Sequence, residues 1–160
     1  MYKFLVTLSA VMLLVLFTFT PHAPIRHPIQ SEACNELESL NHIYRPWRLI
    51  VHSKCITVRG FVRKVIQEPD GDYHIRLKVD KAYRKVLNFG NEFELHGDLV
   101  LEPVCTHGTS HEFEEKACEN YKSKVVIPNV GEHIAVTGQY VTDIMHFWRE
   151  IHPVYQILVE

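Results

Sequence analysis

The sequence ITVRGFVRKVIQEPDGDYHIRLKV, residues 56–79, decides the fold because it predicts two strands joined by a tight turn. Residues 56–65 alternate apolar and polar side chains, as a strand with one buried face does. Asp70 and Gly71 are a strong hairpin turn signal. Residues 72–79 then alternate again. The stretch therefore predicts a β-hairpin with one apolar face.

Alternation sorts the side chains of this hairpin into two sets. The set expected to point inward is apolar: Ile56, Val58, Val62, Tyr73, Ile75, Leu77 and Val79. The set expected to point outward is mostly polar: Thr57, Arg59, Phe61, Arg63, His74, Arg76 and Lys78. The outward face therefore combines cations with an aromatic ring.

Three further strands are expected at residues 99–104, 133–141 and about 150–159, with a helix opening at the Thr109–Glu112 capping box. Five strands with one short helix between the third and fourth predict an all-β OB-fold-like protein, a five-stranded Greek-key barrel. Gly60 and Gly138 fit its strongly curved strands. An immunoglobulin-like sandwich is the main alternative, but it would need about seven strands and no such helix.

The N-terminal residues 1–20 have the layout of an export signal. Lys3 precedes the uncharged apolar run of residues 4–19, which is short for a membrane-spanning helix. Proline follows both Thr20 and Ala23, so the cleavage site is poor. A signal peptide and an uncleaved membrane anchor both stay open, and either predicts a protein that is secreted or held on the outer side of the membrane.

Residues 21–44 are predicted to be a linker and N-terminal arm, and residues 45–160 the OB-fold-like domain. The chain has a formal net charge of −2. Without residues 1–20 the chain loses one lysine, which leaves 16 basic against 19 acidic residues. This balance excludes a general polyanion binder, so any nucleic-acid affinity must come from a local patch.

The four cysteines all follow the apolar run, and an even number in an exported chain predicts two disulfides. Of the three pairings we favour Cys34–Cys55 with Cys105–Cys118. A four-cysteine zinc site is the alternative, but it would lack any Cys-x-x-Cys pair.

The segment from His146 to Pro153, with the sequence HFWREIHP, has the highest density of potentially functional side chains in the chain. In an extended conformation it places His146, Trp148, Glu150 and His152 on one face. Because OB-folds bind ligands between the strand 1–2 and strand 4–5 loops, these side chains are expected to meet those that flank the first hairpin turn, Asp72 and His74.

Three functions are compatible with this pattern. The first is a binding module for a polar or anionic ligand, an oligonucleotide or oligosaccharide. Its predicted ligand-binding residues are Arg59, Phe61, Arg63, Asp72, His74, Arg76, Lys78 and Trp148.

The second is a metal-dependent hydrolase, for example a phosphodiesterase or nuclease. In this hypothesis His146 and His152 bind a divalent metal such as zinc together with Asp72 or Glu102, and Glu150 is the catalytic base. The third is a structural cell-surface accessory domain, in which a hydrogen-bonded histidine–glutamate pair locks the last strand.

Four stretches carry a resemblance to a family of short, exported, uncharacterised proteins with an OB-like barrel. They are CITVRG (residues 55–60), DGDYH (70–74), HGDLVLE (96–102) and the final HFWREIHP. The family ends in a His-Gly-Trp-x-Glu-Ile-His-Pro signature, in which Phe147 replaces the glycine here. The resemblance spans roughly residues 45–155 and implies fold and export, but no activity.

Overall fold

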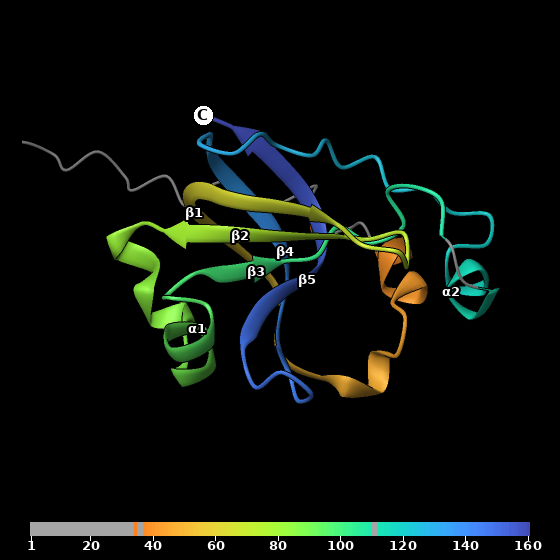
Figure 1. Ribbon diagram of the computed structural model, residues 1–160, viewed down its shortest axis with the longest axis horizontal. Coiled ribbons are helices and arrows are strands. Elements are labelled where there is room, and N and C mark those ends of the chain that lie inside the picture. The colour runs from red at the N-terminus through yellow and green to blue at the C-terminus, as the bar shows by residue number, and fades with distance from the viewer. Residues whose placement is uncertain (1–33, 35–36, 110–111) are drawn as a thin grey trace, which may run out of the picture.

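The structure is a computed structural model that describes residue 34, residues 37–109 and residues 112–160, and it consists mainly of β-strands (Figure 1). The strands are β1 (Leu49–Gln67), β2 (Tyr73–Val79), β3 (Leu99–Leu101), β4 (His133–Asp143) and β5 (Arg149–Val159). The short helices are η2 (Leu37–His42), η3 (Pro46–Arg48), η4 (Lys81–Val86), α1 (Phe89–Glu94) and α2 (Glu112–Ala117). The prediction of a mostly β protein with five strands is confirmed.

The five strands form one sheet that closes on itself. Their order is β1-β2-β3-β5-β4, and β1 pairs with both β2 and β4. All neighbouring strands are antiparallel except β3 and β5, which are parallel. The 19-residue length of β1 allows it to pair with two partners, and a register shift between Val62 and Lys64 bends it within its pairing with β2.

The interior of the closed sheet is apolar. Its buried residues are Val58, Val62, Ile75, Leu77, Val79, Leu99, Leu101, Ile134, Val136, Tyr140, Ile151 and Val154. The inward set predicted for the hairpin agrees with this core, with Ile56 and Tyr73 partly buried against it. The alternation of the first two strands therefore identified the buried face correctly.

Gly60 and Gly138 lie where two strands approach too closely for a side chain. A Cβ atom at Gly60 would collide with the carbonyl oxygen of Lys78 on β2. One at Gly138 would collide with Ile151 and with the backbone of Pro153 on β5. These glycines are thus required by strand packing at the bends of β1 and β4.

Two features differ from the expectation. The structure has a second α-helix, α1, between β2 and β3, which the sequence pattern did not indicate. The segment from His146 to Trp148 belongs to the turn between β4 and β5 and is not extended, because β5 begins only at Arg149. Asn91 of α1 fixes this turn, since its side chain bonds both the N–H and the carbonyl of Arg149.

Both predicted disulfides are present, Cys34–Cys55 and Cys105–Cys118. They indicate folding in an oxidising, extracellular-type compartment. The N-terminal arm packs on the domain, because the His42 ring stacks on Tyr121 at 4.2 Å. The predicted export signal of residues 1–20 lies outside the described residues. Among the described helices, none is long and apolar enough to cross a membrane.

Candidate functional site

The outer face of β2, β3 and β5 carries a cluster of acids and histidines. Because Ile75, Leu101 and Ile151 point into the core and pair in register, their neighbours in sequence point outward. Those neighbours are His74 on β2, Glu102 at the end of β3, and Glu150 and His152 on β5. Register alone therefore brings these four side chains to one face.

His152 is the centre of this acid–histidine cluster. Its Nδ1 lies 2.7 Å from Glu102 Oε2 and 3.0 Å from Glu150 Oε1. All three residues are buried, with Glu150 and His152 at 0% and 1% exposure. The other ring nitrogen, Nε2, is also buried and has no hydrogen-bond partner among the described residues.

Trp148 covers the cluster from the β4–β5 turn. Its Nε1–H donates to Glu150 Oε2 at 3.0 Å, so both oxygens of Glu150 accept hydrogen bonds or an ion pair. His74 contacts the Trp148 ring edge-on at 5.8 Å, and the exposed His146 stacks on it at 4.3 Å. The structure thus brings together His74, His146, Trp148, Glu150 and His152, as expected. It places His146 outside the indole rather than beside His152.

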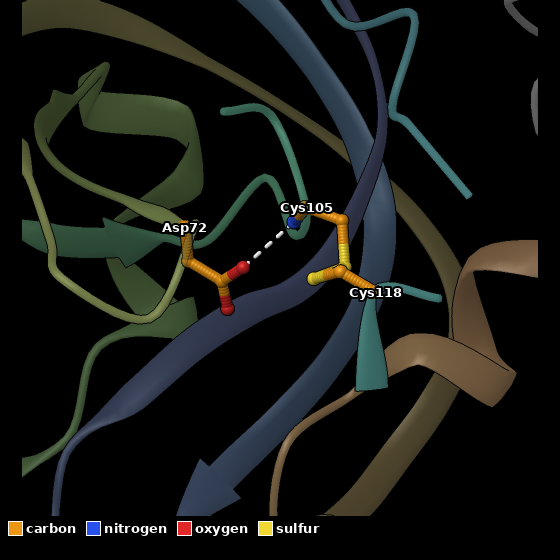
Figure 2. A group of neighbouring side chains, drawn as sticks. All are labelled: Asp72, Cys105 and Cys118. Carbon is orange, nitrogen blue, oxygen red and sulfur yellow. Dashed lines mark hydrogen bonds between the residues drawn. A yellow bond between two sulfur atoms is a disulfide. The ribbon is translucent and has the colours of Figure 1, made fainter. Parts of the chain in front are cut away.

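Asp72 approaches the cluster from the tip of the first hairpin. It is buried and accepts the backbone N–H of Cys105 at 2.7 Å (Figure 2). Its carboxylate, that of Glu102 and a ring nitrogen of His152 lie within 4.8 Å of one another. Asp72 also lies close to Cys105 and Cys118, but those sulfurs are joined in a disulfide and so cannot act as thiolate ligands.

Several carboxylates lie close to the buried imidazole of His152, and their burial and mutual repulsion shift their pKa values. Burial raises the pKa of Asp72 to about 8, helped by the charge of Asp70. Burial and the charge of Glu102 raise the pKa of Glu150 to about 7, and the same two causes raise the pKa of Glu68 to about 7.

Glu102 and His152 behave in the opposite way because they pair. Burial opposes ionisation of Glu102, but the charge of His152 overcomes it and lowers the pKa of Glu102 to about 2. Burial likewise disfavours a charged His152, but Glu102 and Glu150 raise its pKa well above the ordinary value. Arg48 adds a second cation, 3.7 Å from Glu102 and 3.1 Å from Asp143. The cluster is therefore built around an ionised Glu102 and a protonated His152.

A second candidate surface lies at the other end of β2, on its outer side with β1. Phe61 and Lys78 are cross-strand partners, and both are exposed, as is Arg63. They line an open groove of about 640 Å³ together with Lys81 of η4 and the Val130–Gly131 turn. Arg63 and Lys78 also border a groove of about 270 Å³ that reaches Arg84 and His96. We call this surface, defined by Phe61, Arg63, Lys78, Lys81 and Arg84, the basic groove.

The predicted ligand-binding residues therefore divide between two places. Phe61, Arg63 and Lys78 belong to the basic groove, while Asp72, His74 and Trp148 belong to the acid–histidine cluster. Arg59 and Arg76 line neither groove. Arg59 contacts Glu160 at 2.8 Å and Arg76 contacts Asp98 at 3.3 Å, and within the groove Arg84 contacts Glu92 at 3.3 Å. The row of cations expected on one face is thus interrupted by ion pairs.

Sequence reasoning missed Lys81 and Arg84 of the groove, and Glu68 and Arg48 beside the cluster. Lys81 and Arg84 lie on η4, whose six residues show no periodic pattern that would have placed them. Arg48 reaches Glu102 from 54 positions away in sequence, so only the folded arrangement reveals the contact. Glu68 was visible in sequence as the acid that precedes the hairpin turn.

The comparisons with known proteins supply no family assignment. No family model matches the chain, and a search of curated proteins found no match. The function therefore has to be argued from the two surfaces just described.

Proposed function

We propose that this chain is an exported or membrane-tethered binding module of the OB-fold type that holds a single-stranded oligonucleotide in the basic groove. The strand order β1-β2-β3-β5-β4 with a parallel β3–β5 pair supports a Greek-key barrel of this type. The two disulfides support export. The family resemblance of residues 45–155 agrees with both.

The observation that carries this proposal is an exposed aromatic ring flanked by free cations. Phe61 is 50% exposed although it lies in the middle of a paired strand. Lys78 lies directly opposite, and neither Lys78 nor Arg63 makes an ion pair among the described residues. Stacking on an aromatic ring beside lysine and arginine is how sequence-independent binders hold single strands. The groove therefore offers the two interactions that such a ligand needs.

The two ends of β2 differ in charge, and this difference limits where an anionic ligand can lie. Lys78 and His74 are four residues apart, which corresponds to about 13 Å along a strand. The Lys78 end is basic, whereas the His74 end faces Glu68 and Glu102 at 3.7 and 3.8 Å. A polyanion is thus attracted to the η4 end of the hairpin and repelled from its turn.

The test is fluorescence anisotropy with a short labelled oligothymidylate, measured over a range of salt concentrations. Arg63→Ala with Lys78→Ala should reduce the slope of log affinity against log salt by about 1.4, since each lost phosphate contact removes about 0.7. Phe61→Ala should weaken binding by about fivefold or more, the lower end of the energy of stacking one base.

The matched control is Lys54→Ala with Lys116→Ala, which removes the same charge from exposed positions outside both grooves. It should leave the slope unchanged. Equal affinity of wild type and the Arg63/Lys78 variant would rule out the groove as the binding surface. If the ligand is instead bound through charge alone, as a sulfated oligosaccharide would be, Phe61→Ala should have no effect on affinity.

A metal-dependent hydrolase is supported less well. The hypothesis needs Glu150 as a general base, but both of its oxygens already have partners and the residue is fully buried. It also needs His146 as a ligand, and among the described residues His146 belongs to no group of converging ligand atoms. The cluster therefore favours a binding or structural role over water activation.

A further inference from the structure

Three ligand-type side chains from distant segments converge inside the acid–histidine cluster. Asp72 precedes β2, Glu102 follows β3 and His152 lies on β5, yet their potential ligand atoms all lie within 4.8 Å of one another. All three are less than 10% exposed. Such a convergence of two carboxylates and an imidazole in the protein interior is the donor set of a transition-metal site.

The spacing is close to what a metal requires. Ligands at 2.0–2.2 Å from a tetrahedral ion are about 3.3–3.6 Å apart, which follows from the tetrahedral angle. Small side-chain adjustments would therefore close the group around an ion. The Asp72 and Glu102 carboxylates are already held in place, by the Cys105 N–H and by Arg48 respectively.

The second observation is the state of the His152 ring. Its Nδ1 lies 2.7 Å from Glu102, one of the converging carboxylates, and 3.0 Å from Glu150, a buried carboxylate that Trp148 also holds. The ring is therefore fixed with Nδ1 directed at the carboxylates. An ion that replaced the proton on Nδ1 would meet the Glu102 oxygen on the same side of the imidazole.

The charge of the cluster points the same way. Four acids lie there: Glu102 and Glu150 contact His152, Glu68 contacts His74, and Asp72 places a carboxylate oxygen within 4.8 Å of Glu102 and His152. The cations that face them are Arg48 and the protonated His152, whereas burial lowers the pKa of His74 and favours its neutral form. A doubly charged ion would compensate this excess of carboxylates better than a single proton on an imidazole does.

We propose that Asp72, Glu102 and His152, through its Nδ1, bind one divalent transition-metal ion, such as Zn²⁺ or Mn²⁺, with the Glu150 carboxylate beside the same nitrogen. The ion would link the tip of the first hairpin to β3 and β5. The imidazole ligand favours these ions over Ca²⁺ and Mg²⁺, which prefer oxygen donors throughout. This site is independent of ligand binding in the basic groove.

The test is isothermal titration calorimetry of the chelator-treated full chain with Zn²⁺ and Mn²⁺, and with Ca²⁺ and Mg²⁺ for comparison. Wild type should take up one Zn²⁺ or Mn²⁺ per chain and prefer both to Ca²⁺ and Mg²⁺. Glu102→Gln and Asp72→Asn should each weaken uptake by about tenfold or more. Circular dichroism identifies any variant that fails to fold. If one of the two variants does not fold, the other still tests the proposed ligands.

His146→Ala is the matched control. This exposed histidine stacks on Trp148 next to the cluster, so its loss should leave metal affinity within about twofold, although the sequence pattern alone had suggested it as a ligand. Absence of uptake by wild type would overturn the proposal. So would uptake that is unchanged by Glu102→Gln and Asp72→Asn, or uptake that is lost in His146→Ala.

Discussion

His152 Nδ1 lies 2.7 Å from Glu102 Oε2, and both side chains are withdrawn from solvent. This contact joins β5 to the end of β3, where the two strands run parallel. A buried ion pair is costly to break from one side only, because the remaining charge is left without compensation. The pair should therefore dominate the stability of this part of the sheet.

His152→Ala should lower the free energy of unfolding by about 3–5 kcal/mol, since it leaves the Glu102 carboxylate buried and without its closest cation. Urea denaturation followed by circular dichroism measures this difference. His146→Ala, which removes an exposed imidazole from the same segment, should change stability by less than about 0.5 kcal/mol. Similar losses in the two variants would show that the buried pair has no special role.

The stability of the chelator-treated protein should fall as the pH rises from 6 to 9. Asp72 and Glu150 have folded-state pKa values of about 8 and about 7, above their ordinary values of 3.8 and 4.5. The folded state therefore binds more protons than the unfolded chain, and raising the pH disfavours folding. The raised pKa of His152 acts in the same direction, because its stabilisation is present below the ordinary value of 6.5 and is lost as the pH rises through the folded value.

Urea midpoints at several pH values test this expectation, and the loss should amount to at least about 1 kcal/mol. Asp72→Asn removes one of the titrating groups and should flatten the profile. A free energy of unfolding that rises between pH 6 and 9 would contradict the raised pKa values of Asp72, Glu150 and His152.

Phe147→Gly should stabilise the protein. Phe147 adopts φ 61° in the β4–β5 turn, a left-handed conformation that costs a non-glycine residue about 1 kcal/mol, and its side chain is 71% exposed. Glycine adopts this conformation without a Cβ penalty, so it relieves that strain at little loss of packing. Phe147→Ala keeps the strain and serves as the control, so a thermal midpoint raised equally by both variants would argue against a backbone cause.

Replacing Cys105 and Cys118 by serine should lower the free energy of unfolding by about 2–4 kcal/mol, because the disulfide closes a loop with a sequence separation of 13. The same residues hold the backbone next to Asp72, so the double variant should also weaken the proposed metal site. Denaturation with and without Zn²⁺ measures both effects. A double variant as stable as wild type would show that the disulfide is dispensable for the fold.

Much of the sheet could be predicted from sequence because its signals are local. Alternation around Val58 and Ile75 identified the inner face, and the Asp70–Gly71 turn set the first hairpin, which reverses between Gln67 and Tyr73. The start of β1 was set seven residues too late, since residues 49–55 do not alternate and are held by pairing with β4.

Two features depend on contacts that no local sequence pattern encodes. They are helix α1 and the separation of the predicted ligand-binding residues into the basic groove and the acid–histidine cluster. The helix is fixed by the reciprocal Asn88–Asn91 cap and by the bonds from Asn91 to Arg149. Arg76 was expected to contact ligand, but Asp98, which follows α1, lies next to it. Periodicity can state which way a side chain points but not which partner it meets.

The most direct test of the proposed function is nuclear magnetic resonance of the ¹⁵N-labelled chain during titration with oligothymidylate. Binding in the basic groove predicts amide shift changes that concentrate at Phe61, Arg63, Lys78 and Lys81 and fade as salt is added. Changes that concentrate instead around His74 and Trp148, or no changes at concentrations where anisotropy reports binding, would contradict it.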